Sequence, residues 1–178
     1  MNQSNHVEKG HQIPVFAPDP YPEIAVESKN PRYAHILQQD IASARGEMTA
    51  TYQYLYQEWV IHSAEPELAD TLLRIAKVEM HHLQILGELV VLLGGDPRCS
   101  GQNGSFPWNG NLIYYSKSCS AFLRYNISLE KSAVDIYTEQ SRQIRDPLVS
   151  AQLIRMAEDE KIHHALFKSY LERLLPGT

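Results

Sequence analysis

This sequence has little cysteine, no cluster of basic residues and no long hydrophobic run. Its two cysteines, Cys99 and Cys119, do not form the Cys-x-x-Cys pairs of zinc-ribbon or iron–sulfur sites, and we expect free thiols in a reducing compartment. The formal net charge of −5 disfavours nucleic acid as a partner. The longest apolar run, residues 89–93, is too short to cross a membrane, so we expect a soluble, cytoplasmic protein without membrane contact.

Proline and glycine divide the chain into an N-terminal arm and a helical region. Residues 1–30 carry four prolines among polar residues, which predicts an extended arm that either wraps a neighbouring subunit or is disordered. Further along, helix start and stop signals occur at Asn30-Pro31, Pro66, Gly94-Gly95 and Asp146-Pro147. These signals predict helices over residues 32–62, 66–93, 116–145 and 147–174.

The connection between the second and third predicted helices is unusually long. Residues 94–114 are rich in Gly, Asn and Pro and are too many for a hairpin turn. A long crossover between short connections is typical of one type of antiparallel four-helix bundle. We therefore predict an all-α fold, with a single bundle domain over residues 31–175 following the arm of residues 1–30.

Two Glu-x-x-His motifs, each preceded by a single glutamate about 30 residues earlier, are the main functional signal. Positions i and i+3 share one face of a helix, so a carboxylate and an imidazole at this spacing can bind the same metal ion. Apolar residues at helical spacing surround each motif, which favours an inward face over a solvated one. The six candidate ligands are Glu47, Glu79, His82, Glu130, Glu160 and His163.

The charge of this set predicts two metal ions. Four carboxylates crowded into an apolar bundle would repel one another unless about four positive charges lay among them, and two divalent ions supply that charge. Carboxylate oxygens with imidazole suit iron or manganese, and no thiolate is present to select another metal. We therefore expect two Fe or two Mn ions per chain.

The two halves of the helical region resemble each other. Each candidate ligand of the first half has a counterpart 81 or 83 positions later, and a tyrosine follows each single glutamate by seven residues. These tyrosines, Tyr54 and Tyr137, either donate hydrogen bonds to the carboxylates or simply pack in the core. His81 and His164 adjoin the motifs but lie about 100° round the helix, which indicates an outer or surface position. Arg155 is expected to be solvated.

Segments of the first two predicted helices resemble known families of the ferritin-like superfamily, a likeness that covers about residues 30–174. Residues 30–34 and 46–50, Asn-Pro-Arg-Tyr-Ala and Gly-Glu-Met-Thr-Ala, resemble the first helix of manganese catalases. Residues 74–82, Arg-Ile-Ala-Lys-Val-Glu-Met-His-His, resemble rubrerythrins, although this chain has Ala133 where rubrerythrins carry a second helix-three glutamate. The Cys₄ module that rubrerythrins usually append, a built-in electron relay, is also absent from the sequence.

The resemblance implies roles for the candidate ligands. Glu47 and Glu130 would be terminal carboxylates, Glu79 and Glu160 bridging or nearly bridging ones, and the two histidines one nitrogen ligand for each metal. The likeness to manganese catalases implies an alternative for Glu160, which would then orient a solvent ligand.

The predicted function is that of a binuclear redox protein, most simply an oxidoreductase that destroys peroxide as a catalase or a rubrerythrin-like peroxidase. Its partners would be hydrogen peroxide or dioxygen, a separate electron donor if it is a peroxidase, and further copies of the chain in a homo-oligomer. The alternatives are a ferroxidase that handles iron and a structural or coat protein stabilised by its metals.

Overall fold

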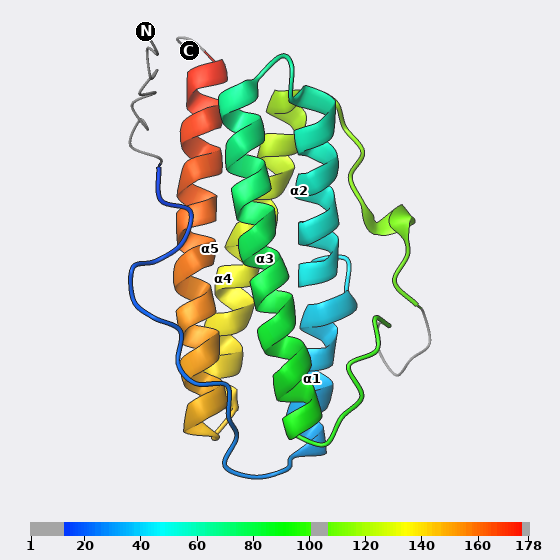
Figure 1. Ribbon diagram of the computed structural model, residues 1–178, viewed down its shortest axis with the longest axis vertical. Coiled ribbons are helices and arrows are strands. Elements are labelled where there is room, and N and C mark those ends of the chain that lie inside the picture. The colour runs from blue at the N-terminus through cyan, green and yellow to red at the C-terminus, as the bar shows by residue number, and fades with distance from the viewer. Residues whose placement is uncertain (1–12, 101–106, 176–178) are drawn as a thin grey trace, which may run out of the picture.

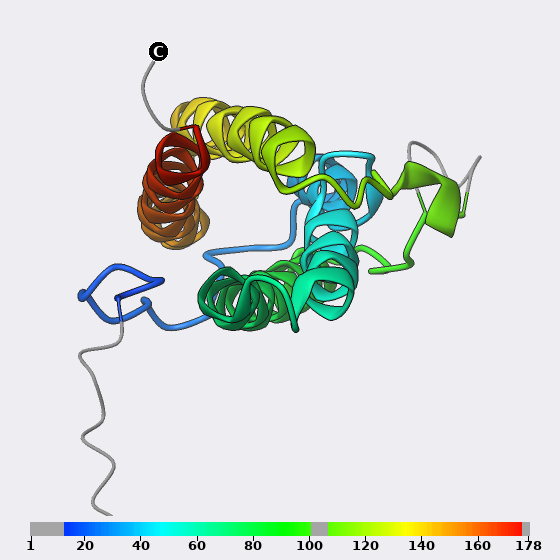
Figure 2. The same cartoon turned by 90° about the horizontal axis from the view of Figure 1, so that it is seen from above.

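The computed structural model describes residues 13–100 and 107–175, and in these ranges the chain forms an antiparallel bundle of helices (Figure 1). The long helices α4 and α5 pack on each other, and α3 packs on both α1 and α2, which follow one another along the opposite corner of the bundle (Figure 2). The elements are α1 (Pro31–Ala42), α2 (Glu47–Ile61), α3 (Pro66–Leu92), the 3₁₀ turn η2 (Gly110–Leu112), α4 (Cys119–Gln143) and α5 (Pro147–Leu174).

The predicted helix signals act at the ends of the helices. Asn30 accepts a hydrogen bond from the Tyr33 amide at the start of α1, and Asp146 accepts hydrogen bonds from the first amides of α5. At the end of α3, Gly94 has a φ of 88°, and the amides of Gly94 and Gly95 donate to carbonyls of the last turn. This left-handed glycine turn stops the helix where the sequence predicted.

The single helix predicted over residues 32–62 is wrong, because the chain breaks between α1 and α2. Ser43 leaves the helix in an extended conformation, and Gly46 passes so close to α1 that a Cβ there would lie 2.5 Å from the Asp40 carbonyl oxygen. The glycine is required at this close approach. As a result, Glu47 is the first residue of α2 and not a residue in the middle of a helix.

The N-terminal arm and the crossover both lie against the outside of the bundle. Residues 13–30 run without helix along α5 of their own chain and then lead into α1 (Figure 1), which confirms the predicted extended arm over this range. Their packing on their own chain was not predicted, and residues 1–12 of the arm lie outside the described residues. On the opposite side, the crossover from α3 to α4 is held to α2: Trp108 donates to the Thr49 hydroxyl (3.0 Å) and the Tyr114 amide donates to Gln53 (3.0 Å).

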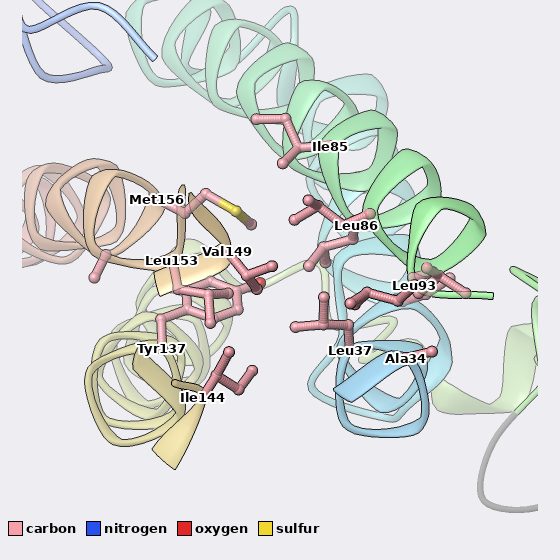
Figure 3. Packing of buried hydrophobic residues seen from close by; sticks show 14 of the residues in the cluster. Ala34, Leu37, Ile85, Leu86, Leu93, Tyr137, Ile144, Val149, Leu153 and Met156 are labelled. Atoms are coloured by element: carbon pink, nitrogen blue, oxygen red, sulfur yellow. The ribbon is translucent and has the colours of Figure 1, made fainter. Parts of the chain in front are cut away.

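The apolar core consists of two clusters of buried residues, one toward each end of the bundle. One cluster contains buried residues between 85 and 93, at the end of α3, and between 149 and 157 on α5. Figure 3 shows Leu37, Leu86 and Leu153 pointing into it from three helices. The other contains residues 68–76 of α3 together with Phe122 and Phe167. The Glu-x-x-His motifs occupy the stretch of α3 and α5 that lies between the two clusters, so the bundle has a polar layer between two apolar ones.

Cys99 and Cys119 are free, as predicted. Among the residues that the structure describes, no helix is both long enough and apolar enough to span a membrane.

Candidate metal centre

The fold brings all six predicted ligands together in the polar layer. Glu47 comes from the start of α2, Glu130 from α4, and one Glu-x-x-His motif each from α3 and α5. None of the six is more than 4% exposed. Their ligand atoms fall into two groups, each with atoms within 4.8 Å of one another: Glu47, Glu79, His82 and Glu160 in one, and Glu79, Glu130, Glu160 and His163 in the other.

The two groups share Glu79 and Glu160 in a nearly symmetric arrangement. The Nδ1 atom of His82 lies 3.1 Å from Glu79 Oε2 and 3.0 Å from Glu160 Oε1. The Nδ1 atom of His163 lies 3.0 Å from Glu79 Oε1 and 2.9 Å from Glu160 Oε2. Each shared carboxylate therefore turns one oxygen toward each histidine, which is the arrangement that two adjacent metal ions require.

The outer nitrogen of each imidazole is already occupied by a hydrogen bond. Nε2 of His163 lies 2.8 Å from the Val15 carbonyl oxygen, and Nε2 of His82 lies 3.1 Å from Asp159 Oδ2. A carbonyl and a carboxylate can only accept, so each Nε2 must carry the hydrogen. In a neutral imidazole the lone pair then sits on Nδ1, which faces the glutamates.

This geometry fits a cation. A lone pair on Nδ1 would meet carboxylate lone pairs at about 3.0 Å, a repulsive contact unless a proton or a metal ion lies between them. In addition, Glu79 Oε1 and Glu160 Oε1 are buried, and with Nδ1 of each imidazole unprotonated no group in the described part of the chain donates a hydrogen bond to them. Buried acceptors without donors are the atoms that a metal ion would satisfy.

Without metal, protons take the place of the cations. Burial raises the pKa of Glu47 and Glu130 well above its usual value, and the neighbouring carboxylates raise it further. Burial lowers the pKa of His82 and His163, but the surrounding carboxylates outweigh this and raise it overall. Burial likewise raises the pKa of Glu160, but the two histidines outweigh it and lower that pKa. The metal-free centre thus favours two glutamic acids and two imidazolium ions.

Tyr54 and Tyr137 each donate a hydrogen bond to the single glutamate of the other one's helix. Tyr54, which follows Glu47 on α2, donates its hydroxyl hydrogen to Glu130 on α4. Tyr137, which follows Glu130, donates to Glu47. Of the two readings that the sequence allowed, hydrogen bonding to the carboxylates applies to both residues, and each also packs in one of the apolar clusters.

The sequence did not predict a buried network of hydrogen bonds around Asp159, outside the candidate ligands. Asp159 is fully buried and accepts from Arg155 (2.6 Å), from the Ala17 amide (2.6 Å) and from the Tyr21 hydroxyl. Burial raises the pKa of Asp159, but the hydrogen bonds from His82, Tyr21 and its other donors outweigh this and lower it to about 2. The prediction of a solvated Arg155 is wrong, because this side chain is 6% exposed. The only sequence signal was an Arg–Asp pair at i, i+4 beside the motif.

The neighbouring histidines lie outside the centre, as their helical position indicated. His81 is exposed and contacts the ring of Tyr21 edge-on, and His164 is half-buried. Neither belongs to the two groups of ligand atoms.

A small cavity reaches the centre at the break between α1 and α2. All four glutamates line it, together with the small side chains of Ala44, Ala50 and Ala133, and with Gly46. The centre of a water-sized sphere can occupy only about 10 Å³ of this cavity, which is close to the minimum that holds one water molecule. At the break, Arg45 donates to the Ser132 hydroxyl across the gap to α4 (2.8 Å). Only a very small molecule fits beside the glutamates.

Two sequence families match different halves of the chain. The profile described as manganese containing catalase matches residues 22–105, and the rubrerythrin profile matches residues 121–178. A protein from Clostridium acetobutylicum described as a "Probable manganese catalase" is 28% identical over 173 residues, covering 85% of this chain and 76% of its own.

Solved structures share the fold at low sequence identity. A manganese catalase from Anabaena PCC7120 aligns with a TM-score of 0.79 at 23% identity, covering 91% of this chain and 83% of its own. A bacterioferritin from Desulfovibrio desulfuricans aligns with a TM-score of 0.66 at 20% identity, covering 80% of each chain. These likenesses confirm the predicted all-α bundle with its long crossover.

Proposed function

We propose that this ferritin-like protein, distantly related to manganese catalases, binds two manganese ions and converts hydrogen peroxide to water and dioxygen. The observation that carries the proposal is the pair of buried ligand groups that share Glu79 and Glu160. The matches to manganese catalases in sequence and in fold support the choice of metal and substrate.

The ligands would divide between the ions as the two groups divide. His82 with Glu47 would hold one ion through Nδ1 and a carboxylate, and His163 with Glu130 would hold the other. Glu79 and Glu160 would bridge, since each turns one oxygen toward each histidine. When bound, the two ions would supply the two-electron changes that reduce one peroxide to water, with cleavage of its O–O bond, and oxidise a second peroxide to dioxygen.

The rest of the chain prepares the centre for that chemistry. The tyrosine hydroxyls donate to one oxygen each of Glu47 and Glu130 and so fix the orientation of these carboxylates. At Glu130 the other oxygen, Oε2, faces His163, whereas at Glu47 the oxygen that accepts from Tyr137 is also the one that faces His82. The apolar clusters above and below the polar layer exclude bulk water. The cavity at Ala133 and Gly46 has room for about one water-sized molecule, so it excludes larger organic substrates.

A ferroxidase is the second candidate, and the match of residues 121–178 to rubrerythrin together with the bacterioferritin likeness favours it. In that case the same six ligands would bind iron, and dioxygen or peroxide would be the oxidant. Ala133 separates this chain from rubrerythrins at the centre itself, because it lines the cavity where they carry a carboxylate.

The test is metal content and oxygen release measured on one sample. Protein from metal-supplemented cells is analysed by plasma mass spectrometry while oxygen evolution from peroxide is recorded. About two manganese per chain with oxygen release would support the proposal. Two iron per chain without oxygen release would favour the ferroxidase, and no bound metal would refute both.

Matched variants tie that result to the centre. Glu79→Gln keeps the shape of a shared ligand but removes its charge, so it should lose metal and oxygen release together. Glu88→Gln alters an exposed glutamate on the same helix and should behave as the unaltered protein does.

A further inference from the structure

The N-terminal arm reaches the outer edge of both histidines of the centre. On one side, the Val15 carbonyl oxygen accepts from Nε2 of His163 at 2.8 Å. On the other, the Tyr21 hydroxyl lies 3.2 Å from Nε2 of His82 and donates to Asp159, which accepts from the same nitrogen. One short segment of the chain thus touches the hydrogen-bond partners of both rings.

Arg155 fastens this segment to α5. Its guanidinium donates to the carbonyl oxygens of Asp19 (2.7 Å) and Ala17 (2.8 Å), and also to Asp159 (2.6 Å). The same group lies 4.1 Å from the centre of the Tyr21 ring. The Ala17 amide donates to Asp159 at 2.6 Å, so the arm is held by both its carbonyl and its amide groups.

These contacts decide how the imidazoles can bind metal. With Nε2 held outward, each ring keeps Nδ1 pointing at Glu79 and Glu160. Without the arm, His163 would lose its acceptor, and Asp159 would lose the two donors that orient it toward His82. Both rings could then rotate, or present the other nitrogen.

We propose that residues 15–21 of the arm are a positioning element of the metal centre, so that docking of the arm and binding of the two metals stabilise each other. This inference rests on the proposed metal centre. Because the linkage is a thermodynamic one, it must act in both directions: an undocked arm weakens metal binding, and metal binding holds the arm in place.

The first test removes one hydroxyl from the arm. Tyr21→Phe in the full chain deletes the hydrogen bonds to Asp159 and His82 but keeps the ring against Arg155. Loss of such an outer partner typically weakens metal binding about 10- to 100-fold. Affinity for Mn²⁺ is measured by competition with a fluorescent chelator. Tyr33→Phe is the matched control, because the Tyr33 hydroxyl accepts from the Arg145 amide far from the centre.

The second test reads the linkage from the arm itself. Hydrogen exchange of the Ala17 amide, which donates to Asp159, should slow when Mn²⁺ is added to the metal-free protein. The Asn30 amide, which donates to the Leu93 carbonyl at the end of α3, serves as the control and should change much less.

The possible outcomes distinguish failure of the proposed metal centre from failure of the proposed role of the arm. If the unaltered protein binds no Mn²⁺, the metal centre is refuted and the inference with it. If it binds Mn²⁺ but Tyr21→Phe matches Tyr33→Phe in affinity, and Ala17 exchanges equally in both forms, the role of the arm alone is overturned. Weaker binding in Tyr21→Phe with metal-dependent protection of Ala17 would establish it.

Discussion

Metal binding should release about four protons per chain, a number that follows from the buried charges of the centre. The pKa values of Glu47, Glu130, His82 and His163 are all raised, so each of these four groups keeps its proton to a higher pH than usual when no metal is bound. Two divalent ions bring four positive charges into the same space. Exchange of about four protons for two ions leaves the buried charge unchanged, which avoids a large desolvation penalty.

The release gives metal binding a steep pH dependence. The equilibrium constant for loading both ions should rise by up to about four powers of ten per pH unit below the pKa values of the folded protein. Titration of metal-free protein with Mn²⁺ in a calorimeter, in two buffers that differ in ionisation enthalpy, counts the protons directly. Release of fewer than about one proton per chain would refute the protonation states deduced from the geometry.

The same protonation makes the metal-free protein less stable as the pH rises. A raised pKa in the folded state means that folding takes up protons, so the free energy of unfolding falls as pH increases. The glutamic acids contribute this fall above their ordinary pKa of 4.5 and the imidazolium ions above 6.5, until the pKa of the folded state is passed. Denaturation of the metal-free protein between pH 5 and pH 9 should show the decline, and loading with metal should remove it.

Three further predictions concern single side chains. Glu79→Ala should abolish loading of two metals and lower the melting temperature, because both groups of ligands use Glu79; mass spectrometry that still finds two metals per chain would contradict its shared role, and Glu88→Ala is the control. His82→Ala should lose metal while His81→Ala keeps it, and equal losses would mean that the wrong histidine faces the centre. Leu37→Ala should reduce the free energy of unfolding by about 2–5 kcal/mol because this fully buried side chain leaves a cavity, and a loss below about 1 kcal/mol in urea would contradict that packing.

The sequence by itself determined most of the helices and the set of candidate ligands, because both depend on local spacing. Caps such as Asp146 and stops such as Gly94 act within a few residues of the chain, and they lie at the observed helix ends. Positions i and i+3 of a helix share a face whatever the surroundings, so each Glu-x-x-His pair could be recognised without a structure.

The break between α1 and α2 could not be predicted from local sequence signals. Glycine in a helical stretch usually weakens the helix without ending it, so Gly46 alone did not predict a break. Its effect depends on the close approach to the Asp40 carbonyl oxygen, which is a property of the folded path. The break in turn opens the cavity beside the glutamates.

Only the tertiary structure decided what surrounds the ligands. The hydrogen bonds from Tyr54 and Tyr137 to the glutamates span 76 and 90 positions of the sequence. The contacts of the arm with Asp159 and His163 span 138 to 148 positions. Contacts of that range leave no periodic trace in one sequence, because they depend on which helices become neighbours and where the arm passes. The donor types could therefore be read from the chain, whereas the orientation of each donor is set by packing.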